Sequence, residues 1–473
     1  MKNFNNENPE SMPKIRVARL DERYPLEPLF GRIFSPFEQF LRRTTAGGIV
    51  LIATTIAALV LATALGADAI HRFTEQPLAL FTSEWWSLGL SVHEWVNDGL
   101  MTFFFLLVGL ELKREILVGE LSSLKDAALP VVAALGGMVL PALCYAVFNA
   151  GTPAAAGWGI PMATDIAFAV GILVLLAWRV PKNLIIFLTA LAIADDLGAV
   201  LVIAVFYTAD INVYMLAAAA SLLGLLVLFN RAGIRHPLAY AILGVLLWFA
   251  VHTSGVHATL SGVLLAMAIP ARPAYTPAHF ERRIDELQSA FRANRRDKNS
   301  TDDPLSNQRM AAIAHAMERS AVAVQSPLQR IEHGLTPWVT FLIVPVFALS
   351  NAGIDLFSIT WSEALASKIT LGVISGLLVG KFAGITLFSW IAIRVGIARL
   401  PAGVSWTQLM GAAWLAGIGF TMSLFIAQLA LTTPEAIDQA KLGILLGSSI
   451  SAVIGLLWLY LHSRQHSERP RDA

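Results

Sequence analysis

The sequence predicts an all-α polytopic membrane protein with about 12 transmembrane helices. Of its 473 residues, 56% are hydrophobic and 14% are charged, whereas soluble domains carry about 25% charged residues. The apolar residues form long runs, unlike the alternating pattern of a membrane β-barrel. Two groups of three helices have inverted topology, with the second helix interrupted in each, as in secondary transporters. We therefore expect inverted-topology repeats with helices four and eleven interrupted.

Composition also excludes several functional classes. The net charge of +1 argues against a nucleic-acid partner, which would require a basic surface. The single cysteine, Cys144, excludes an internal disulfide and a cysteine-based metal site. Nothing in the composition points to a bound cofactor, and membrane lipid is the expected surrounding.

The N-terminal residues 1–44 form a polar, basic arm. The segment 35–38 (SPFE) resembles a helical capping box with proline at the first helical position. Apolar residues at helical spacing flank it, which predicts a short interfacial helix over about 30–43. The arm has no apolar run of signal-peptide length, so the first hydrophobic helix would direct insertion.

Twelve apolar segments are candidates for membrane spans. Eight lie in the region 45–270 and four in the region 331–461. The candidates are 45–65, 95–116, 127–149, 157–178, 183–208, 213–230, 237–252, 256–270, 333–352, 368–393, 406–430 and 441–461.

The distribution of Lys and Arg predicts the orientation, because cytoplasmic loops are enriched in these residues. The opposite side carries Arg72, Lys368 and Lys441 in its loops. The short loops on the N-terminal side carry Lys113, Arg114, Lys125, Arg179, Lys182, Arg231, Arg235, Arg394 and Arg399. Both termini, including the tail 462–473, are therefore expected in the cytoplasm.

Two connections between the spans are unusual. The segment 78–96 contains Trp85, Trp86 and Trp95 and is either an outer β-hairpin or an interfacial aromatic segment. A hairpin with unpaired edges would favour a homodimer through this segment. The charged cytoplasmic insertion 271–330 contains two amphipathic helices around Phe280–Phe291 and Met310–Met317, joined by a polar linker. These helices are expected on the membrane surface or free to move.

Two adjacent carboxylates, Asp195 and Asp196, lie in the apolar run 183–208. An ionised carboxylate at bilayer depth costs several kcal/mol, so the pair needs a physical reason. It is either a structural pair satisfied by hydroxyls or a buried lysine, or a site for a cation or protons. Helical rise places Asp195 and the Thr164-Asp165 pair at similar depth, about 10–12 Å from the outer edge. Asp196 should point about 100° away from Asp195.

Three other ionisable residues lie in predicted spans. Lys381 is near the middle of helix ten, where a lone ammonium must pair with a carboxylate or lose its proton. Asp98 and Glu111 lie near the two ends of helix two. They are either functional groups or are explained by snorkelling and by pairing with Lys113 and Arg114.

Two helices contain interruptions. Helix four has the sequence GWGIPMATD over 157–165, which includes Pro161, and helix eleven has GIGFTMS over 417–423, which includes Gly417 and Gly419. Interrupted helices at matching positions of inverted halves are a sequence indicator of a transport site. The opposed helix ends leave partial charges in the membrane, and Asp165 and Lys381 are suitably placed to compensate them.

The spans resemble the NhaA family of sodium/proton antiporters over about 45–461. The motifs that carry the resemblance are FFFLLVGLELKRE at 103–115, ATDIAFA at 163–169, the pair 195–196, SGVHAT at 254–259, VPVFALSNAG at 344–353 and GIGFTMS at 417–423. The family fold has twelve helices, with helices four and eleven interrupted and crossing at the midplane.

The resemblance implies roles for individual residues. Asp195 and Asp196 resemble the central acidic pair of the family, Asp165 and Thr164 its helix-four partners, and Lys381 its helix-ten lysine. Glu111, Glu332 and His257 match positions linked in the family to the pH response, and Asp98 is a further candidate on helix two. Without the resemblance, the sequence indicates that His257 is a capping or interfacial histidine. It likewise indicates that Glu332 lies at a solvated helix entrance.

The expected function is therefore electrogenic export of Na⁺ or Li⁺ in exchange for entering protons, for pH and sodium homeostasis. Protons and Na⁺ would compete for Asp195 and Asp196, with Asp196 the more direct Na⁺ ligand and Asp195 titrating beside Lys381. One alternative is a Na⁺-coupled organic-anion transporter on the same scaffold. Another is an intramembrane aspartyl protease, an enzyme that typically carries a Gly-x-Gly-Asp sequence, which is absent here.

Overall fold

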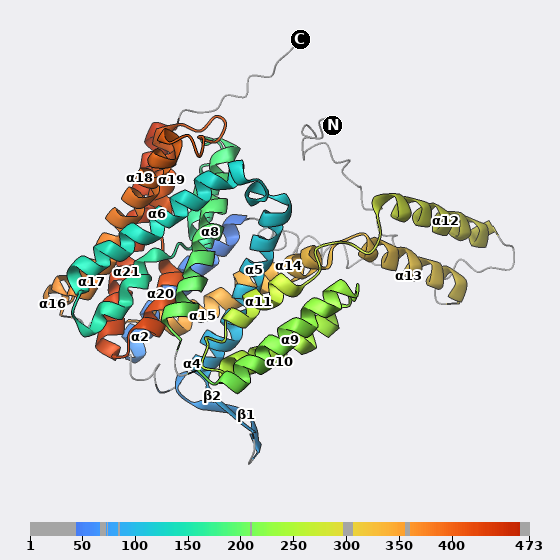
Figure 1. Cartoon of the computed structure of the whole chain (residues 1–473), viewed down its shortest axis with the longest axis horizontal. Coiled ribbons are helices and arrows are strands. Elements are labelled where there is room, and N and C mark those ends of the chain that lie inside the picture. Colours follow the sequence, from blue (N-terminus) through green and yellow to red (C-terminus); the bar gives the residue numbers. More distant parts are fainter. Residues whose placement is uncertain are drawn as a thin grey trace, which may run out of the picture.

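The computed structural model describes residues 44–66, 72, 74–83, 86–208, 211–296, 306–354 and 360–463. These residues form a bundle of helices with one two-stranded sheet (Figure 1). The predicted arm with its interfacial helix, most of the polar linker near 300 and nearly all of the C-terminal tail lie outside the described residues.

Within the described ranges, eight helical segments are long and apolar enough to cross a membrane. They are Ala46–Ala64, Leu124–Asn149, Pro153–Leu175, Lys182–Phe206, Val213–Arg231, Pro327–Asn351, Lys368–Arg394 and Pro434–His462. A ninth is the bent pair α19 (Trp406–Leu415) and α20 (Phe420–Ala430), whose two helices differ in direction by 48°. The chain is therefore a polytopic helical membrane protein.

The remaining bounds follow the predicted spans, with some shifted ends. The first half contains α2 (Thr44–Leu65), α4 (Val92–Glu94), η2 (Trp95–Leu100), α5 (Met101–Val118), η3 (Glu120–Ser122), α6 (Leu124–Asn149), η4 (Pro153–Met162), α7 (Ile166–Leu175), α8 (Lys182–Phe206), α9 (Val213–Arg231), α10 (Pro237–Thr253) and α11 (Leu260–Ala268). The second half contains α12 (Pro277–Arg296), α13 (Gln308–Ala323), α14 (Pro327–Trp338), η5 (Val339–Ile343), α15 (Val344–Asn351), α16 (Trp361–Ala366), α17 (Lys368–Ser375), η6 (Gly376–Gly380), α18 (Lys381–Arg394) and α21 (Pro434–His462).

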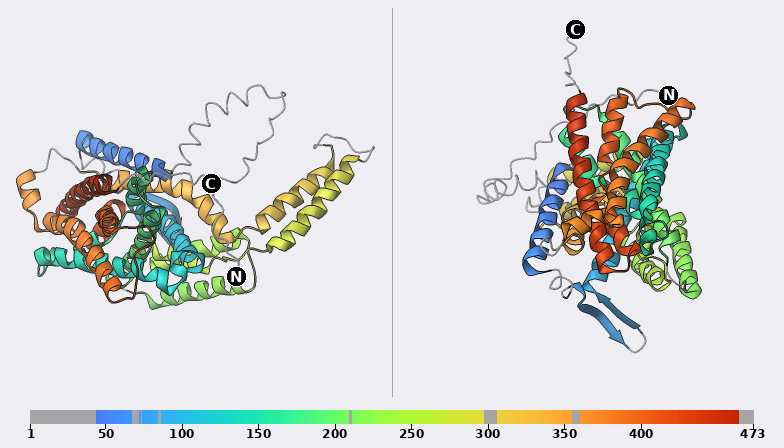
Figure 2. Two further views of the ribbon diagram at one scale, coloured as in Figure 1. Left: turned by 90° about the horizontal axis from the view of Figure 1, so that it is seen from above. Right: turned by 90° about the vertical axis from the view of Figure 1, so that its left-hand side faces the viewer.

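The segment between the first two spans is a β-hairpin, which confirms one of the two alternatives. Strand β1 (Pro77–Ser83) pairs antiparallel with β2 (Trp86–Ser91), with Pro77 opposite Ser91. Ser91 then begins α4 with a capping box, because its hydroxyl accepts the Glu94 N–H and the Glu94 carboxylate accepts the Ser91 N–H. The hairpin extends from the end of the bundle opposite the C-terminal end of α21 (Figure 2), and we call this the hairpin end.

The insertion contains the two predicted amphipathic helices, α12 and α13. They lie side by side and project from the bundle (Figures 1 and 2). The backbone N–H groups of Ala274 and Tyr275 donate to the Ala323 carbonyl and close the base of this pair. Ser326 caps α14 by accepting the Gln329 N–H at 3.1 Å, and Pro327 occupies the first helical position.

The core of the bundle is built around α20. Nine of the eleven residues of α20 are buried, whereas α9 buries only Ala219 and Leu226. Large apolar side chains of α8 and α9, such as Val205 and Val213, are exposed on the outside, as expected for a surface that faces lipid. The interrupted helix with its polar Thr421 and Ser423 is therefore the most enclosed element of the bundle.

Candidate functional site

The two interrupted spans meet through backbone and side-chain hydrogen bonds. The first span changes from a 3₁₀ helix ending at Met162, through an extended stretch, to α7 beginning at Ile166, so Pro161 directly precedes the break. The Asp165 N–H donates to the Ile418 carbonyl at 2.6 Å, between Gly417 and Gly419 in the other break. Both segments predicted to interrupt a helix, 157–165 and 417–423, contain a break, and the two broken spans are bonded to each other.

Asp165 lies at the N-terminal ends of two helices. It caps α7 by accepting the Phe168 N–H at 3.2 Å. It also accepts the N–H of Thr421, near the start of α20, at 3.1 Å, and the Thr421 hydroxyl at 2.6 Å. The positive ends of both helix dipoles therefore face one carboxylate, which agrees with the expectation that Asp165 compensates them.

Lys381, Asp195 and Thr164 form a buried polar cluster. The Lys381 ammonium forms an ion pair with the Asp195 carboxylate and donates to the Thr164 hydroxyl at 2.9 Å. The Thr164 hydroxyl lies 2.7 Å from Asp195 Oδ2 and 2.9 Å from the Ala416 carbonyl oxygen. We expected Lys381 to compensate the negative C-terminal ends of the helices. Among the described residues it instead contacts the Asp195 carboxylate and the Thr164 hydroxyl, and it makes no direct contact with a helix C-terminus.

Asp196 differs from its neighbour. Its side chain is fully buried, yet neither carboxylate oxygen has a hydrogen-bond partner among the described residues. The Asp195 Oδ1 atom is likewise without a partner there, whereas Asp195 Oδ2 is paired. A buried unpaired carboxylate is strongly unfavourable unless a proton or a cation neutralises it. Of the two adjacent carboxylates, Asp196 is therefore the one that most needs a bound proton or cation.

A cavity of about 870 Å³ leads toward this site from the end of the bundle opposite the hairpin. Its lining includes Asp165 and Thr421 at the inner end and Glu111, Arg114 and Glu332 nearer the end of α5. A hard cation prefers oxygen ligands, and the Asp165 carboxylate at the lining of this cavity is such a ligand.

Glu332 is not at a solvated helix entrance. The helix begins at Pro327 rather than at 333, so Glu332 lies in its second turn with 5% of its surface exposed. Its carboxylate forms an ion pair with Arg114 of α5. No ion pair joins Glu111 to Lys113 or Arg114 in the described part of the chain, because Lys113 instead donates to backbone carbonyls such as that of Met267, at 2.7 Å.

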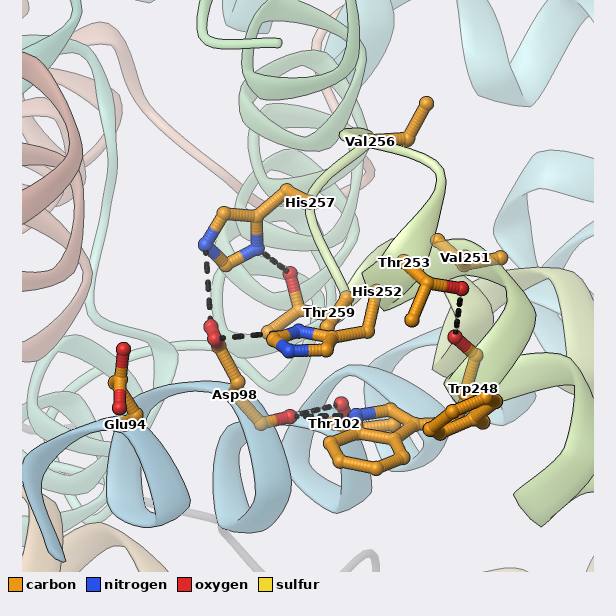
Figure 3. Close-up of polar contacts among 12 residues, drawn as sticks. Glu94, Asp98, Thr102, Trp248, Val251, His252, Thr253, Val256, His257 and Thr259 are labelled. Atoms are coloured by element: carbon orange, nitrogen blue, oxygen red, sulfur yellow. Dashed lines mark hydrogen bonds and ion pairs between the residues drawn. The ribbon is translucent and has the colours of Figure 1, made fainter. Parts of the chain in front are cut away.

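The other two pH-response candidates lie at the hairpin end, apart from Glu111 and Glu332. Asp98 Oδ1 lies 3.5 Å from His257 Nε2, and Asp98 Oδ2 lies 3.7 Å from His252 Nδ1 (Figure 3). His257 precedes α11 and contacts the Thr259 hydroxyl at 2.7 Å. The four candidates therefore form two groups at opposite ends of the bundle.

Sequence reasoning missed three residues of these clusters. Thr421 is part of the GIGFTMS motif. Its position beside the helix break could have identified it as a residue of the site. Arg114 was considered only as a partner of Asp98 or Glu111, although it pairs with Glu332. His252 is the last residue of the predicted span 237–252, and its proximity to Asp98 depends on how α10 packs against η2.

Comparison with known proteins gives a consistent result. A family model described as Na⁺/H⁺ antiporter 1 matches residues 38–459. The Na⁺/H⁺ antiporter NhaA of Syntrophobacter fumaroxidans is 60% identical over 447 residues, which cover 94% of each chain. That of Acidithiobacillus ferrooxidans is 56% identical, covering 93% of this chain and all of the other, and antiporter NhaA 1 of Saccharophagus degradans is 50% identical, covering 92% and 93%. The chain therefore belongs to the Na⁺/H⁺ antiporter 1 family.

Proposed function

We propose that this protein exchanges Na⁺ or Li⁺ for protons across the membrane. The observation that carries the proposal is the buried Asp196 carboxylate, which has no partner among the described residues and lies beside a paired Asp195. A protonated carboxylic acid is a poor ligand for Na⁺, whereas the ionised form is a good one. Protons and Na⁺ therefore compete for one site, and exchange follows without separate ion pathways.

Individual residues have distinct roles in this proposal. Asp196 is the most direct ligand of the transported Na⁺, supported by Asp165, the Thr164 hydroxyl and backbone carbonyls at the breaks. Asp195 titrates beside Lys381, and the Lys381–Asp195 ion pair must open or lose a proton during the cycle. If more than one proton is exchanged for each Na⁺, transport is electrogenic.

The proposal includes a membrane arrangement. Twelve helices form inverted repeats in which the two broken spans cross at the midplane, with membrane segments 45–270 and 331–461. The arm 1–44, the insertion 271–330 and the tail 462–473 lie in the cytoplasm of a bacterial cell with this protein in its inner membrane. The excess of Lys and Arg in the short loops supports this orientation, and the cavity that reaches Asp165 then opens to the cytoplasm.

Regulation and assembly complete the proposal. Glu111 and Glu332 at the cytoplasmic end, and Asp98 and His257 at the outer end, tune activity with pH for sodium and pH homeostasis. The exposed edges of the β1–β2 hairpin pair with those of a second copy, giving a homodimer.

The test is Na⁺-dependent exchange in everted vesicles, followed with a dye that reports the pH gradient. We expect Na⁺ and Li⁺, but not K⁺, to discharge the gradient in vesicles with the wild-type chain. The variants Asp195→Asn and Asp196→Asn should each abolish the signal. Exchange that survives in both variants would contradict the proposal.

The two alternatives receive no support from the names of the similar proteins. A Na⁺-coupled organic-anion transporter would show counterflow of an anion in the same vesicles. An intramembrane protease would cleave a membrane peptide in a manner that requires Asp195 or Asp196. The same vesicle preparations distinguish all three activities.

A further inference from the structure

Asp98 lies between two histidines at the hairpin end of the bundle (Figure 3). It belongs to η2, His252 to the last turn of α10, and His257 to the turn before α11. Each carboxylate oxygen faces a different imidazole, at 3.5 Å for His257 and 3.7 Å for His252. These distances are longer than those of a tight hydrogen bond, so neither histidine is held in a fixed pairing with the carboxylate.

Exposure decreases along this cluster from the outside inward. The side chain of His252 is 27% exposed, that of Asp98 20% and that of His257 11%. The His257 ring then lies edge-on against Phe425 of α20, with ring centroids 5.3 Å apart, and Phe425 is fully buried. The cluster therefore extends from solvent at the hairpin end to the helix whose Thr421 binds Asp165.

Packed aromatic side chains lie at the inner end of this histidine cluster. Phe425 also contacts Phe105 of α5 at 5.5 Å and Phe347 of α15 at 6.2 Å between ring centroids. The open cavity, by contrast, reaches Asp165 from the other end of the bundle. In this conformation the histidine cluster is therefore on the closed side of the site.

The position of His252 is fixed by stacked rings. Its ring stacks on Trp248 at 5.5 Å with an interplanar angle of 9°, and Trp248 stacks on Trp95. The Trp248 indole N–H donates to the Asp98 backbone carbonyl at 3.0 Å. Trp248 thus holds His252 and the backbone of Asp98 in one arrangement, with His252 Nδ1 directed at Asp98 Oδ2.

Within the described ranges, the polar surroundings of the cluster come from its own helix and from α15. Glu94, one turn before Asp98, acts electrostatically on both Asp98 and His252. His93 contacts Asn97, whose side chain in turn accepts a hydrogen bond from Asn351 of α15. Phe425 is the contact from α20. Two histidines thus face the single carboxylate of Asp98 at a partly exposed site, and free imidazole titrates near neutral pH.

We propose that His252 is the outermost proton acceptor of the exchange cycle, passing protons from solvent at the hairpin end to Asp98. A ring nitrogen of His252 takes a proton from water and becomes an imidazolium. The imidazolium then gives a proton to the Asp98 carboxylate, which restores the neutral imidazole and leaves Asp98 as a carboxylic acid. His257 receives the proton next, where the path is closed by Phe425. This role rests on the proposed Na⁺/H⁺ exchange.

The test uses right-side-out vesicles loaded with Na⁺, in which the hairpin end faces the bath. The rate of proton uptake is measured while the pH of the bath is varied. For His252→Ala we expect a loss of about tenfold at alkaline bath pH, where protons are scarce and capture limits the rate, and near wild-type rates at acid pH. Imidazole in the bath should restore the alkaline rate, because it replaces the missing proton carrier.

Three controls separate proton transfer from packing. His315→Ala removes an exposed histidine of α13 and should leave the rate unchanged with or without imidazole. His252→Gln keeps a polar side chain of similar size but cannot carry a proton, so it should show the same alkaline loss as His252→Ala. Adding His252→Gln to Asp98→Asn should cause no further loss, because both act in one path.

Each outcome decides the proposal. Wild-type rates at alkaline pH in His252→Ala, or wild-type rates in His252→Gln, would overturn it, as would an alkaline loss that imidazole does not restore. Absence of exchange in the wild-type chain would instead contradict the proposed function itself, so the two failures are distinguishable.

Discussion

Asp165 accepts two hydrogen bonds from Thr421, one from the backbone N–H at 3.1 Å and one from the hydroxyl at 2.6 Å. The two residues belong to different interrupted spans, so this contact joins the two breaks. Both residues are at most 3% exposed. A carboxylate held in this way is oriented by fixed dipoles rather than by water, which suits a site that must bind and release a small ion.

Removal of the Thr421 hydroxyl should weaken this arrangement. Valine has nearly the same shape as threonine but no hydroxyl, so Thr421→Val loses the 2.6 Å hydrogen bond to Asp165. A hydrogen bond to a charged group contributes about 1.5–3 kcal/mol, so we expect a roughly tenfold or greater loss of apparent Na⁺ affinity. Thr421→Ser retains the hydroxyl and is the matched control. Equal Na⁺ affinities of the Val and Ser variants in vesicle exchange would contradict this role.

Asp195 and Asp196 should respond differently to replacement by asparagine. Asp195→Asn leaves the buried Lys381 ammonium without its ion-pair partner, which should cost about 3–5 kcal/mol of stability. Asp196→Asn breaks no hydrogen bond among the described residues and should leave the melting temperature unchanged or raised. Exchange should be lost in both. Thermal unfolding of the purified variants separates the two effects, and equal destabilisation would contradict the asymmetry.

Competition at the site predicts a specific pH dependence. Protonated carboxylates do not bind Na⁺, so the apparent KM for Na⁺ should rise as the pH falls. By proton linkage it rises about tenfold per pH unit when one proton competes and about a hundredfold when two compete. The slope, measured from exchange rates at several Na⁺ concentrations and pH values, reports the number of protons displaced. An apparent KM that does not vary with pH would exclude direct competition.

Much of the central site could be predicted from the sequence. The similar depth of Asp165 and Asp195 followed from helical rise alone, and the different environments of Asp195 and Asp196 followed from the 100° turn per residue. The breaks were visible because Pro161, Gly417 and Gly419 interrupt apolar runs. The hairpin remained one of two alternatives, because tryptophans fit both a strand and a membrane interface.

What could not be predicted depends on packing between distant segments. Arg114 and Glu332 are separated by 218 positions, and nothing local indicates that they pair. The first turns of α14 contain Arg330, Glu332 and His333, so hydropathy alone placed the start of this helix at 333 rather than at Pro327. The Ser326 cap was the better indicator of that boundary, because it depends on backbone hydrogen bonding rather than on hydropathy.

The Arg114–Glu332 ion pair should hold the cavity mouth between α5 and α14. Glu332→Gln removes the charge from a nearly buried carboxylate and leaves the Arg114 guanidinium without its partner on α14. The Arg114 side chain is 36% exposed and partly screened by solvent, so breaking the pair should cost about 1–3 kcal/mol, between the values for exposed and buried pairs. We therefore expect a lower melting temperature and a looser contact between the two helices. Thr336 lines the same cavity one turn further along α14. In a Cys144→Ser background, a Thr336→Cys thiol should therefore react several-fold faster with a water-soluble maleimide when Glu332→Gln is added.

An exposed ion pair of the same chain provides the matched control. Arg283 and Glu286 pair on α12 with about half of each side chain in solvent, and such pairs contribute about 0–1 kcal/mol. Glu286→Gln should change neither the melting temperature nor the labelling rate at position 336. If Glu332→Gln behaves like this control in both measurements, the pair does not restrain the cavity mouth, and its width is set by the apolar contacts of α2 and η5 instead.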